Sequence, residues 1–293
     1  VTLVIPYVVP FYLLLAALED SGVLTRVAFM MDSAMHKIGL HGKAIIPIIL
    51  GYGCNVPAIY STRIMGSRRE RLLTAFAITF APCPARTVVI LGLVAAFLGI
   101  WWALAVYVIN LLIMFGMVKL AAKAVPGDLT GMIMEMHSFK TPSLSIVGKQ
   151  TWARTKSLIY MVFPIYMITS ALVQGAYALG WLNPVNNAMS FLTVGVLRLP
   201  VLAGTFLIFG AARKELTLLM AVAIFGTNLA LHLTSAQLVT LALVATIYPC
   251  MATIGTLTKE FGWKSAWAVI GASFATSILV GSIAARILPS VHF

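Results

Sequence analysis

Residues 44–62 read AIIPIILGYGCNVPAIYST, a run that carries no charged side chain but contains several helix-breaking residues. Gly51, Gly53 and Pro57 lie inside the run, and both residue types weaken a helix interior. If the run crossed a membrane once, the lysines before it and the arginines after it would lie on opposite sides. Backbone groups freed by a break are tolerated at membrane depth only where protein or a wet cavity satisfies them. The run therefore predicts a broken or re-entrant membrane segment, with a single crossing as the alternative.

Composition places most of the chain in a lipid bilayer. Of the 293 residues, 61% are hydrophobic and 10% are charged, with a mean hydropathy of +1.00, whereas soluble domains are roughly 45–50% apolar and about 25% charged. Apolar runs of about 18 residues or more are typical of transmembrane helices. Such runs cover 1–18, 72–85 continuing into 87–118, 157–197, 216–258 and 265–285. Because the longest runs must hold two spans each, we predict an all-α polytopic membrane protein with seven or eight membrane segments.

The basic residues lie in loops between the apolar runs and give a formal net charge of +12. One cluster consists of Arg63, Arg68, Arg69 and Arg71, and the other of Lys119, Lys123, Lys140, Lys149, Arg154 and Lys156. Two spans separate the clusters and return them to the same side, which the positive-inside rule assigns to the cytoplasm. Anionic headgroups of the lipid bilayer are the expected partner of this charge, and nucleic acid is not expected.

The sequence divides into two halves that resemble each other. Residues 1–125 form the first half and 156–293 the second, and 126–155 form a polar linker with an amphipathic surface helix. Each half holds a Pro-Cys pair inside an apolar helix, in APCPA at 81–85 and in YPCMA at 248–252. Interrupted helices at matching positions of two repeats indicate a binding site near the membrane midplane of a transporter.

Motifs for enzymatic chemistry are absent from the sequence. Gly42-Lys43 is followed by alanine and Gly148-Lys149 by glutamine, so neither pair belongs to a nucleotide-binding loop. No H-E-x-x-H, C-x-x-C or G-x-S-x-G pattern occurs. We therefore expect no enzyme activity and no permanently bound cofactor.

All three cysteines stand beside helix-breaking residues. Cys54 lies in GYGCNVP next to Asn55, Cys83 lies in APCPA, and Cys250 lies in YPCMA. A broken helix exposes carbonyl oxygens at midplane depth, and a thiolate beside them favours Fe²⁺, Cu⁺ or Zn²⁺ over Na⁺ or K⁺. The alternative is that these are small buried residues chosen for packing. The pattern predicts a metal path at Cys54, Asn55, Cys83 and Cys250.

A few charged residues could complete such a path. An acid inside a membrane costs about 2.5–3.5 kcal/mol, and only eight acids occur in the chain. Glu215 is the best candidate for a metal ligand, with an ion pair to Arg213 or Lys214 as the alternative. Asp20 is a second candidate ligand, and Glu19 beside it is a candidate charge partner, although a plain interfacial position explains both. Arg86 and Arg213 are candidate gating residues or charge partners.

Eight stretches, in order along nearly the whole chain, match one known pattern. They are LEDSG at 18–22, GYGCNVPAI at 51–59 with Thr62 and Arg63, RLLT at 71–74, CPAR at 83–86, MEM at 134–136 with Pro142 and TWAR at 151–154, GAARKE at 210–215, YPC at 248–250 and EFGWK at 260–264. Together they resemble the ferrous-iron transport protein B family (FeoB). The resemblance implies an Fe²⁺ importer of the inner membrane, with two gate-type halves and with Cys54 and Cys83 in the translocation path.

The chain also departs from that family's pattern. The matching stretches do not include the family's GTP-binding domain, so the resemblance does not carry regulation by GTP over to this chain. A separate GTPase or small cytoplasmic partner and a homo-oligomer are expectations. Pro82 replaces a serine and Thr87-Val88-Val89-Ile90 replaces Leu-Pro-Val-Tyr. These departures keep two alternatives open: a gate-domain carrier of a nucleoside or another small organic solute, and a membrane scaffold that transports nothing itself.

Overall fold

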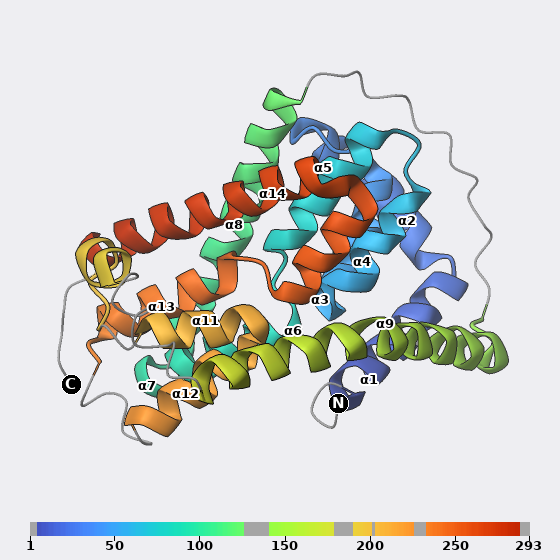
Figure 1. The fold of residues 1–293 in the computed structure, drawn as a ribbon. Helices are drawn as coiled ribbons and strands as arrows, with labels where there is room; N and C mark the ends of the chain where they lie inside the picture. The colour runs from blue at the N-terminus through green and yellow to red at the C-terminus, as the bar shows by residue number, and fades with distance from the viewer. Residues whose placement is uncertain (1–4, 126–140, 179–189, 201–202, 226–232, 288–293) are drawn as a thin grey trace.

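The structure is a computed structural model that describes residues 5–125, 141–178, 190–200, 203–225 and 233–287. Every regular element in these ranges is helical (Figure 1). The first half contains α1 (Ile5–Asp20), α2 (Val23–Lys37), η1 (Gly42–Ala44), α3 (Ile45–Gly53), α4 (Asn55–Ser61), η2 (Thr62–Ile64), α5 (Arg68–Phe80), α6 (Pro84–Ile90), η3 (Leu91–Ala95), α7 (Ala96–Leu98) and α8 (Ile100–Ala124). The second contains α9 (Leu144–Ala178), η4 (Phe191–Val196), α11 (Ala203–Ala212), α12 (Lys214–Phe225), α13 (Ser235–Ile247) and α14 (Met251–Ile287).

Three helical stretches of the described chain are long and apolar enough to cross a membrane. They are Arg68–Leu98, Ile100–Ala124 and Ser235–Ile287. The all-helical architecture is therefore confirmed, while the count of seven or eight segments stays a prediction. Helix α3 has nine residues and spans about 14 Å, less than half of the roughly 30 Å hydrocarbon core. Its length suits a re-entrant segment, which also stays a prediction.

The two halves share an order of elements. A pair of short helices comes first, α3 with α4 and α11 with α12, and a longer helix follows that is interrupted at a Pro-Cys pair. Further on, Gly99 (φ 94°) and Gly262 (φ 79°) each interrupt the chain with a positive φ, which glycine adopts without steric cost. A long helical stretch follows each glycine, α8 after Gly99 and the rest of α14 after Gly262. The internal repeat itself stays a prediction.

Two apolar cores lie on either side of the interrupted helices. One core joins α3, α4 and α5 to α8 and to the first part of α14. The other joins α6 and η3 to α11 and α13. Helix α6 of the first half contacts α12 and α13 of the second. The breaks after α5 and α13 therefore lie where the two cores and the two halves of the chain meet.

Helix α9 begins inside the predicted linker. Its first residue is Leu144, whereas we expected a linker over 126–155, and residues 126–140 of that linker lie outside the described ranges. Helix α9 runs along α1 (Figure 1). The boundary predicted at 155 thus falls within one continuous helix.

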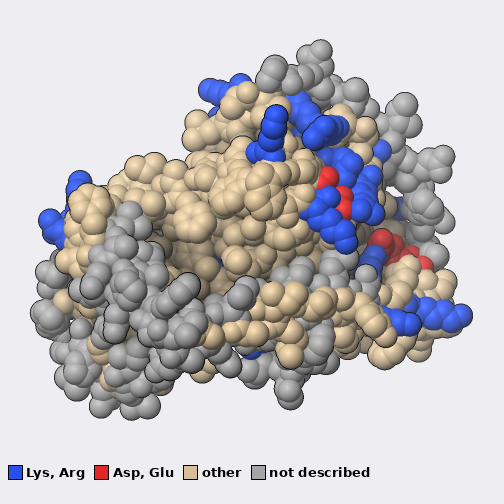
Figure 2. Space-filling model, viewed as in Figure 1, with Lys and Arg blue, Asp and Glu red and all other residues tan. Residues whose placement is uncertain are grey.

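Charged side chains are unevenly distributed over the surface. Figure 2 shows lysines, arginines and a few acids gathered on one part of the face, with a broad area free of charge beside them. Glu260, whose side chain is 4% exposed, forms ion pairs with Arg63 and, at 3.1 Å, with Arg71. The hydrogen bond from Arg63 to Glu260, and then the attraction between the two charges, raises the pKa of Arg63. This triad ties α14 to η2 and α5.

Candidate functional site

The three cysteines occupy the same position in three helices. Each is the residue just before a helix begins: Cys54 precedes α4, Cys83 precedes α6 and Cys250 precedes α14. The carbonyl of each accepts a bond from the amide four residues on, at 3.0–3.4 Å. All three thiols are free and half-buried. The thiolate is the form of cysteine that ligates metal.

The Cys54 break leaves polar groups without partners. Cys54 is extended (φ −167°, ψ 132°) between α3 and α4. The last carbonyls of α3, at 51–53, lack an intrahelical donor, and within the described residues no side chain donates to them. Pro57 has no N–H for the carbonyl of Gly53. Asn55 is 5% exposed, and its buried Oδ1 has no hydrogen-bond partner. A thiol, an amide oxygen and main-chain oxygens are thus available in one short stretch.

The break at Cys83 is closed by Arg86. Its guanidinium is 1% exposed and donates to the carbonyls of Thr79 at 2.6 Å and Ala81 at 2.9 Å. A third bond of 3.3 Å reaches the carbonyl of Tyr248 in the other half. Cys83 lies at the midpoint of the candidate span Arg68–Leu98. Arg86 therefore joins the two breaks at the middle of a membrane-length helix.

The break at Cys250 is closed by a lysine. Lys214 is 3% exposed, and its Nζ donates to the carbonyls of Ala245 at 2.7 Å and Tyr248 at 2.6 Å. The same ammonium lies 3.2 Å from the centroid of the Tyr248 ring, which is a cation–π contact. Cys250 itself has its Sγ 3.2 Å from Oγ1 of Thr253. Two side-chain cations thus share the carbonyl oxygen of Tyr248.

The three thiols lie near one another but do not form a closed cage. Cys54 interacts electrostatically with Cys83, Cys250 and Glu215. Within the described part of the chain, no three His, Cys, Asp or Glu side chains are grouped closely enough to hold a metal ion. The described thiols therefore do not form a closed metal cage.

The other acids and bases singled out from the sequence have varied surroundings. Glu215 is half-buried in the first turn of α12, and Arg213 lies at the turn between α11 and α12. Asp20 accepts a bond from the amide of Ser143 at 2.8 Å, and Glu19 pairs with Arg154 at 2.5 Å. The latter two contacts attach α1 to the start of α9. The role of Glu215 and Asp20 as metal ligands and the role of Glu19 and Arg213 as charge partners stay predictions.

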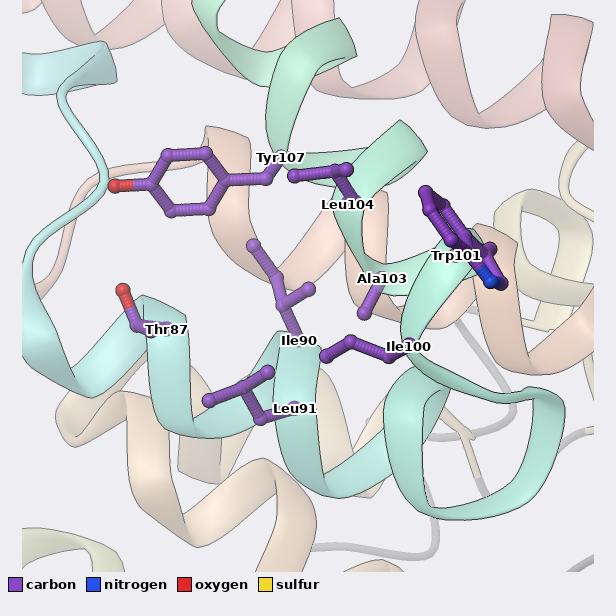
Figure 3. A pocket seen from close by; sticks show the side chains of 8 residues that line it. All are labelled: Thr87, Ile90, Leu91, Ile100, Trp101, Ala103, Leu104 and Tyr107. Atoms are coloured by element: carbon purple, nitrogen blue, oxygen red, sulfur yellow. The ribbon is translucent and has the colours of Figure 1, made fainter.

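An apolar pocket of about 320 Å³ lies beside the Cys83 break (Figure 3). It is lined by residues of α6, η3 and α8, namely Thr87, Ile90, Leu91, Ile100, Trp101, Ala103, Leu104 and Tyr107. Thr87 also donates to the carbonyl of Cys83 at 3.3 Å. Figure 3 shows the hydroxyls of Thr87 and Tyr107 near one end and Trp101 near the other. The pocket has few polar atoms that could bind a metal ion. Its apolar walls suit an apolar group instead.

Sequence reasoning missed Lys214 as a functional residue. It considered Lys214 only as an ion-pair partner of Glu215, whereas the ammonium binds main-chain oxygens of the Cys250 break. Pro249 was the signal in the sequence. Because proline has no N–H, it leaves the carbonyl of Ala245, four residues earlier, without its helical donor. That missing donor could have prompted a search for a buried donor elsewhere in the chain.

Comparison with known proteins gives two family matches and a set of relatives. Residues 1–97 match the Gate model, described as "Nucleoside recognition", and 103–154 match the model of the ferrous iron transport protein B C terminus. The Fe(2+) transporter FeoB of Escherichia coli K12 is 36% identical over 170 residues, which is 57% of this chain and 22% of that protein. FeoB of Salmonella typhimurium is 35% identical over the same coverage. The chain thus spans about a fifth of these relatives, and no solved structure gives a significant match.

Proposed function

The chain belongs to the FeoB family as part of its membrane region, and on that premise we propose that it conducts ferrous iron, or a similar divalent transition metal, across the inner membrane. The observation that carries the proposal is the shared placement of Cys54, Cys83 and Cys250. Each thiol stands at a helix start beside a main-chain break, and Cys54 interacts electrostatically with both others. Such a set of sulphur and oxygen atoms can replace the water around a metal ion in steps.

The Cys54 break is the proposed first binding point. Its thiol, the unpaired Oδ1 of Asn55 and the free carbonyls at 51–53 supply both soft and hard ligands. Borderline ions such as Fe²⁺ accept such mixed sets, whereas Na⁺ and K⁺ gain little from sulphur. Because a thiol must lose its proton to bind metal, occupancy of this point should increase with pH.

The energy for uptake can come from the membrane potential. It contributes about 2.3 kcal/mol per elementary charge for each 100 mV, so a divalent ion gains twice that amount. In the proposed multi-pass arrangement in the inner membrane, the basic loops face the cytoplasm. A separate GTPase, a small cytoplasmic protein or a second copy of the chain are the partners we propose for control of the flux.

The test is uptake of Fe²⁺, Zn²⁺ and Mn²⁺ by proteoliposomes under anaerobic conditions. The wild-type chain should take up Fe²⁺, and the double substitution Cys54→Ser with Cys83→Ser should abolish that uptake. Met30→Ser is the control, because it removes a sulphur from a side chain that is 80% exposed on α2. Absence of wild-type flux for all three ions would contradict metal transport, and unchanged flux in the double variant would contradict the role of the thiols.

A second candidate is transport of a small organic solute. The family model matched by 1–97 is described as "Nucleoside recognition", and the pocket of Figure 3 is within the usual size range of small-molecule sites, about 300–1,000 Å³. The hydroxyls of Thr87 and Tyr107 and the indole nitrogen of Trp101 are its visible polar groups (Figure 3), so the pocket matches the apolar part of a solute better than its sugar. Competition of Fe²⁺ uptake by nucleosides would favour this candidate.

A further inference from the structure

The carbonyl of Ala245 has no helical hydrogen-bond donor, because the residue four positions later is a proline. In a continuous helix the amide of residue 249 would donate to it, but residue 249 is proline and has no N–H. The carbonyl of Tyr248 is free as well, because α13 ends at Ile247 and α14 begins only at Met251. Two main-chain oxygens therefore face the interior of the protein without backbone partners. A pair of carbonyl oxygens of this kind is what a dehydrated cation binds.

The ammonium of Lys214 occupies this pair of oxygens. Its bonds of 2.7 and 2.6 Å satisfy Ala245 and Tyr248, and the Tyr248 ring covers it at 3.2 Å. The lysine is held in place by its own backbone, since α11 and α12 pack on one another and Thr217 of α12 donates to the carbonyl of Phe206 at 3.4 Å. A cation that belongs to the chain thus fills a cation site.

No carboxylate compensates for this charge. Within the described residues neither Lys214 nor Arg86 lies within ion-pair distance of an acid, and burial, together with the nearby Arg86, lowers the pKa of Lys214. Burying unpaired charges costs several kcal/mol per ion. An apolar residue and a well-placed hydroxyl would satisfy the same oxygens more favourably, so stability alone does not explain a lysine here. The nearest favourable charges would be thiolates of Cys83 and Cys250, which interact with both cations.

We propose that Lys214 is a tethered cation that holds the carbonyl site of the Tyr248 break until a metal ion displaces it. The proposal rests on the proposed metal transport and adds to it the residue that sets the threshold for passage. A divalent ion that reaches the thiols of Cys83 and Cys250 brings a larger charge to the same oxygens. The ammonium then leaves Ala245 and Tyr248, and it returns when the ion has passed. Na⁺ and K⁺ lack the charge and the affinity for sulphur that this displacement requires.

The direct test measures where Lys214 lies when metal is bound. The purified chain is treated with an amine-acetylating reagent in the presence and absence of Zn²⁺, which has no redox chemistry, and acetylation of each lysine is read by mass spectrometry. Zn²⁺ should increase the acetylation rate of Lys214 about tenfold, the ratio that corresponds to ~1.4 kcal/mol. Lys149, which is exposed on α9, should not change. In parallel, a maleimide measures whether Zn²⁺ protects the thiols.

The two readouts separate the two proposals. If Zn²⁺ protects the thiols while the acetylation of Lys214 stays the same, the displacement is wrong and metal binding at the thiols stands. If Zn²⁺ protects no thiol and the wild-type chain conducts no metal, the proposed function falls, and the displacement falls with it. Acetylation that increases at Lys214 together with thiol protection supports both.

Substitution gives a second measurement. Lys214→Met keeps an unbranched side chain, one atom shorter, and removes the charge, so the apparent KM for Fe²⁺ should fall at least about tenfold, because a positive charge in a medium of low dielectric constant opposes a cation strongly. Lys214→Arg keeps the charge and should not lower KM, and Lys149→Met is the control. An unchanged KM in a folded Lys214→Met chain would overturn the proposal. If that variant does not fold, the acetylation experiment on the wild-type chain decides.

Discussion

Gly210 provides a sharp test of the packing that positions Lys214. A Cβ added to Gly210 would lie 2.0 Å from Oγ1 of Thr217 and 2.6 Å from the hydroxyl of Tyr248. Neither neighbour can move aside at low cost. Thr217 is fully buried, and the hydroxyl of Tyr248 donates to the carbonyl of Leu207 at 2.9 Å. The substitution Gly210→Ala must therefore push α11 away from α12 and from the end of α13.

The expected cost follows from three contributions. Overpacking a dense interior costs about 1–3 kcal/mol, and each of the two hydrogen bonds, from Thr217 and from Tyr248, is worth about 0.5–1.5 kcal/mol. Alanine gains about 1 kcal/mol over glycine in a helix interior. The losses outweigh that gain, so we expect Gly210→Ala to lower the free energy of unfolding by about 1–5 kcal/mol.

Thermal unfolding in detergent, followed by tryptophan fluorescence, measures the effect. The control is Gly271→Ala in α14, where an added Cβ would meet no atom within 4 Å, so this variant should be as stable as the wild-type chain or slightly more stable. Adding Thr217→Ala to Gly210→Ala removes the closest clash and should restore part of the loss. Equal melting temperatures for Gly210→Ala and Gly271→Ala would refute the close packing of α11 on α12.

Four further substitutions test three contacts away from the packing of α11 on α12. Oγ1 of Thr246 donates to Oδ1 of Asn110 at 3.2 Å, and either Asn110→Ala or Thr246→Val removes this hydrogen bond. A double-mutant cycle in thermal unfolding should give a coupling free energy of about 0.5–1.5 kcal/mol between the two substitutions. Additive effects of the two would contradict the bond. Glu260→Gln removes the carboxylate that pairs with both Arg63 and Arg71. It should lower the melting temperature more at low salt than at high salt, because salt screens the charges of the wild-type triad. An equal loss at both salt concentrations would exclude an ionic cause. Glu19→Gln breaks the exposed pair with Arg154 and should change stability by less than about 1 kcal/mol, so a large loss would show that this pair holds α1 on α9.

Much of the fold was predictable because the signals are local. Apolar runs, glycines and prolines lie next to one another in the sequence, and they located the membrane-length helices and the breaks at Cys54, Cys83 and Cys250. The linker boundary at 155 was harder, because α9 begins at Leu144 and its polar first turns look like a loop. The number of membrane segments depends on lengths and tilts that composition does not encode.

The polar contacts of the site were predictable only where donor and acceptor are close in sequence. Arg86 follows the Cys83 break directly, and it was singled out as a gating residue for that reason. Lys214 lies more than thirty residues before the carbonyls that it binds, so no spacing rule connects the two. Sequence reasoning treated every break as a source of free carbonyls and had no means to find which of them are already satisfied.

The three breaks differ in whether a side chain donates hydrogen bonds to their carbonyl oxygens. At the Cys83 break the guanidinium of Arg86 serves two carbonyls of the first half, and at the Cys250 break the ammonium of Lys214 serves two of the second. Within the described residues, the Cys54 break has no such donor, and the Oδ1 of Asn55 is buried there without a partner. Buried polar atoms are normally hydrogen-bonded, and an exception needs an explanation. Under the proposed function, an incoming ion finds open oxygens at Cys54, and at the other two breaks it must compete with Arg86 and Lys214 for them.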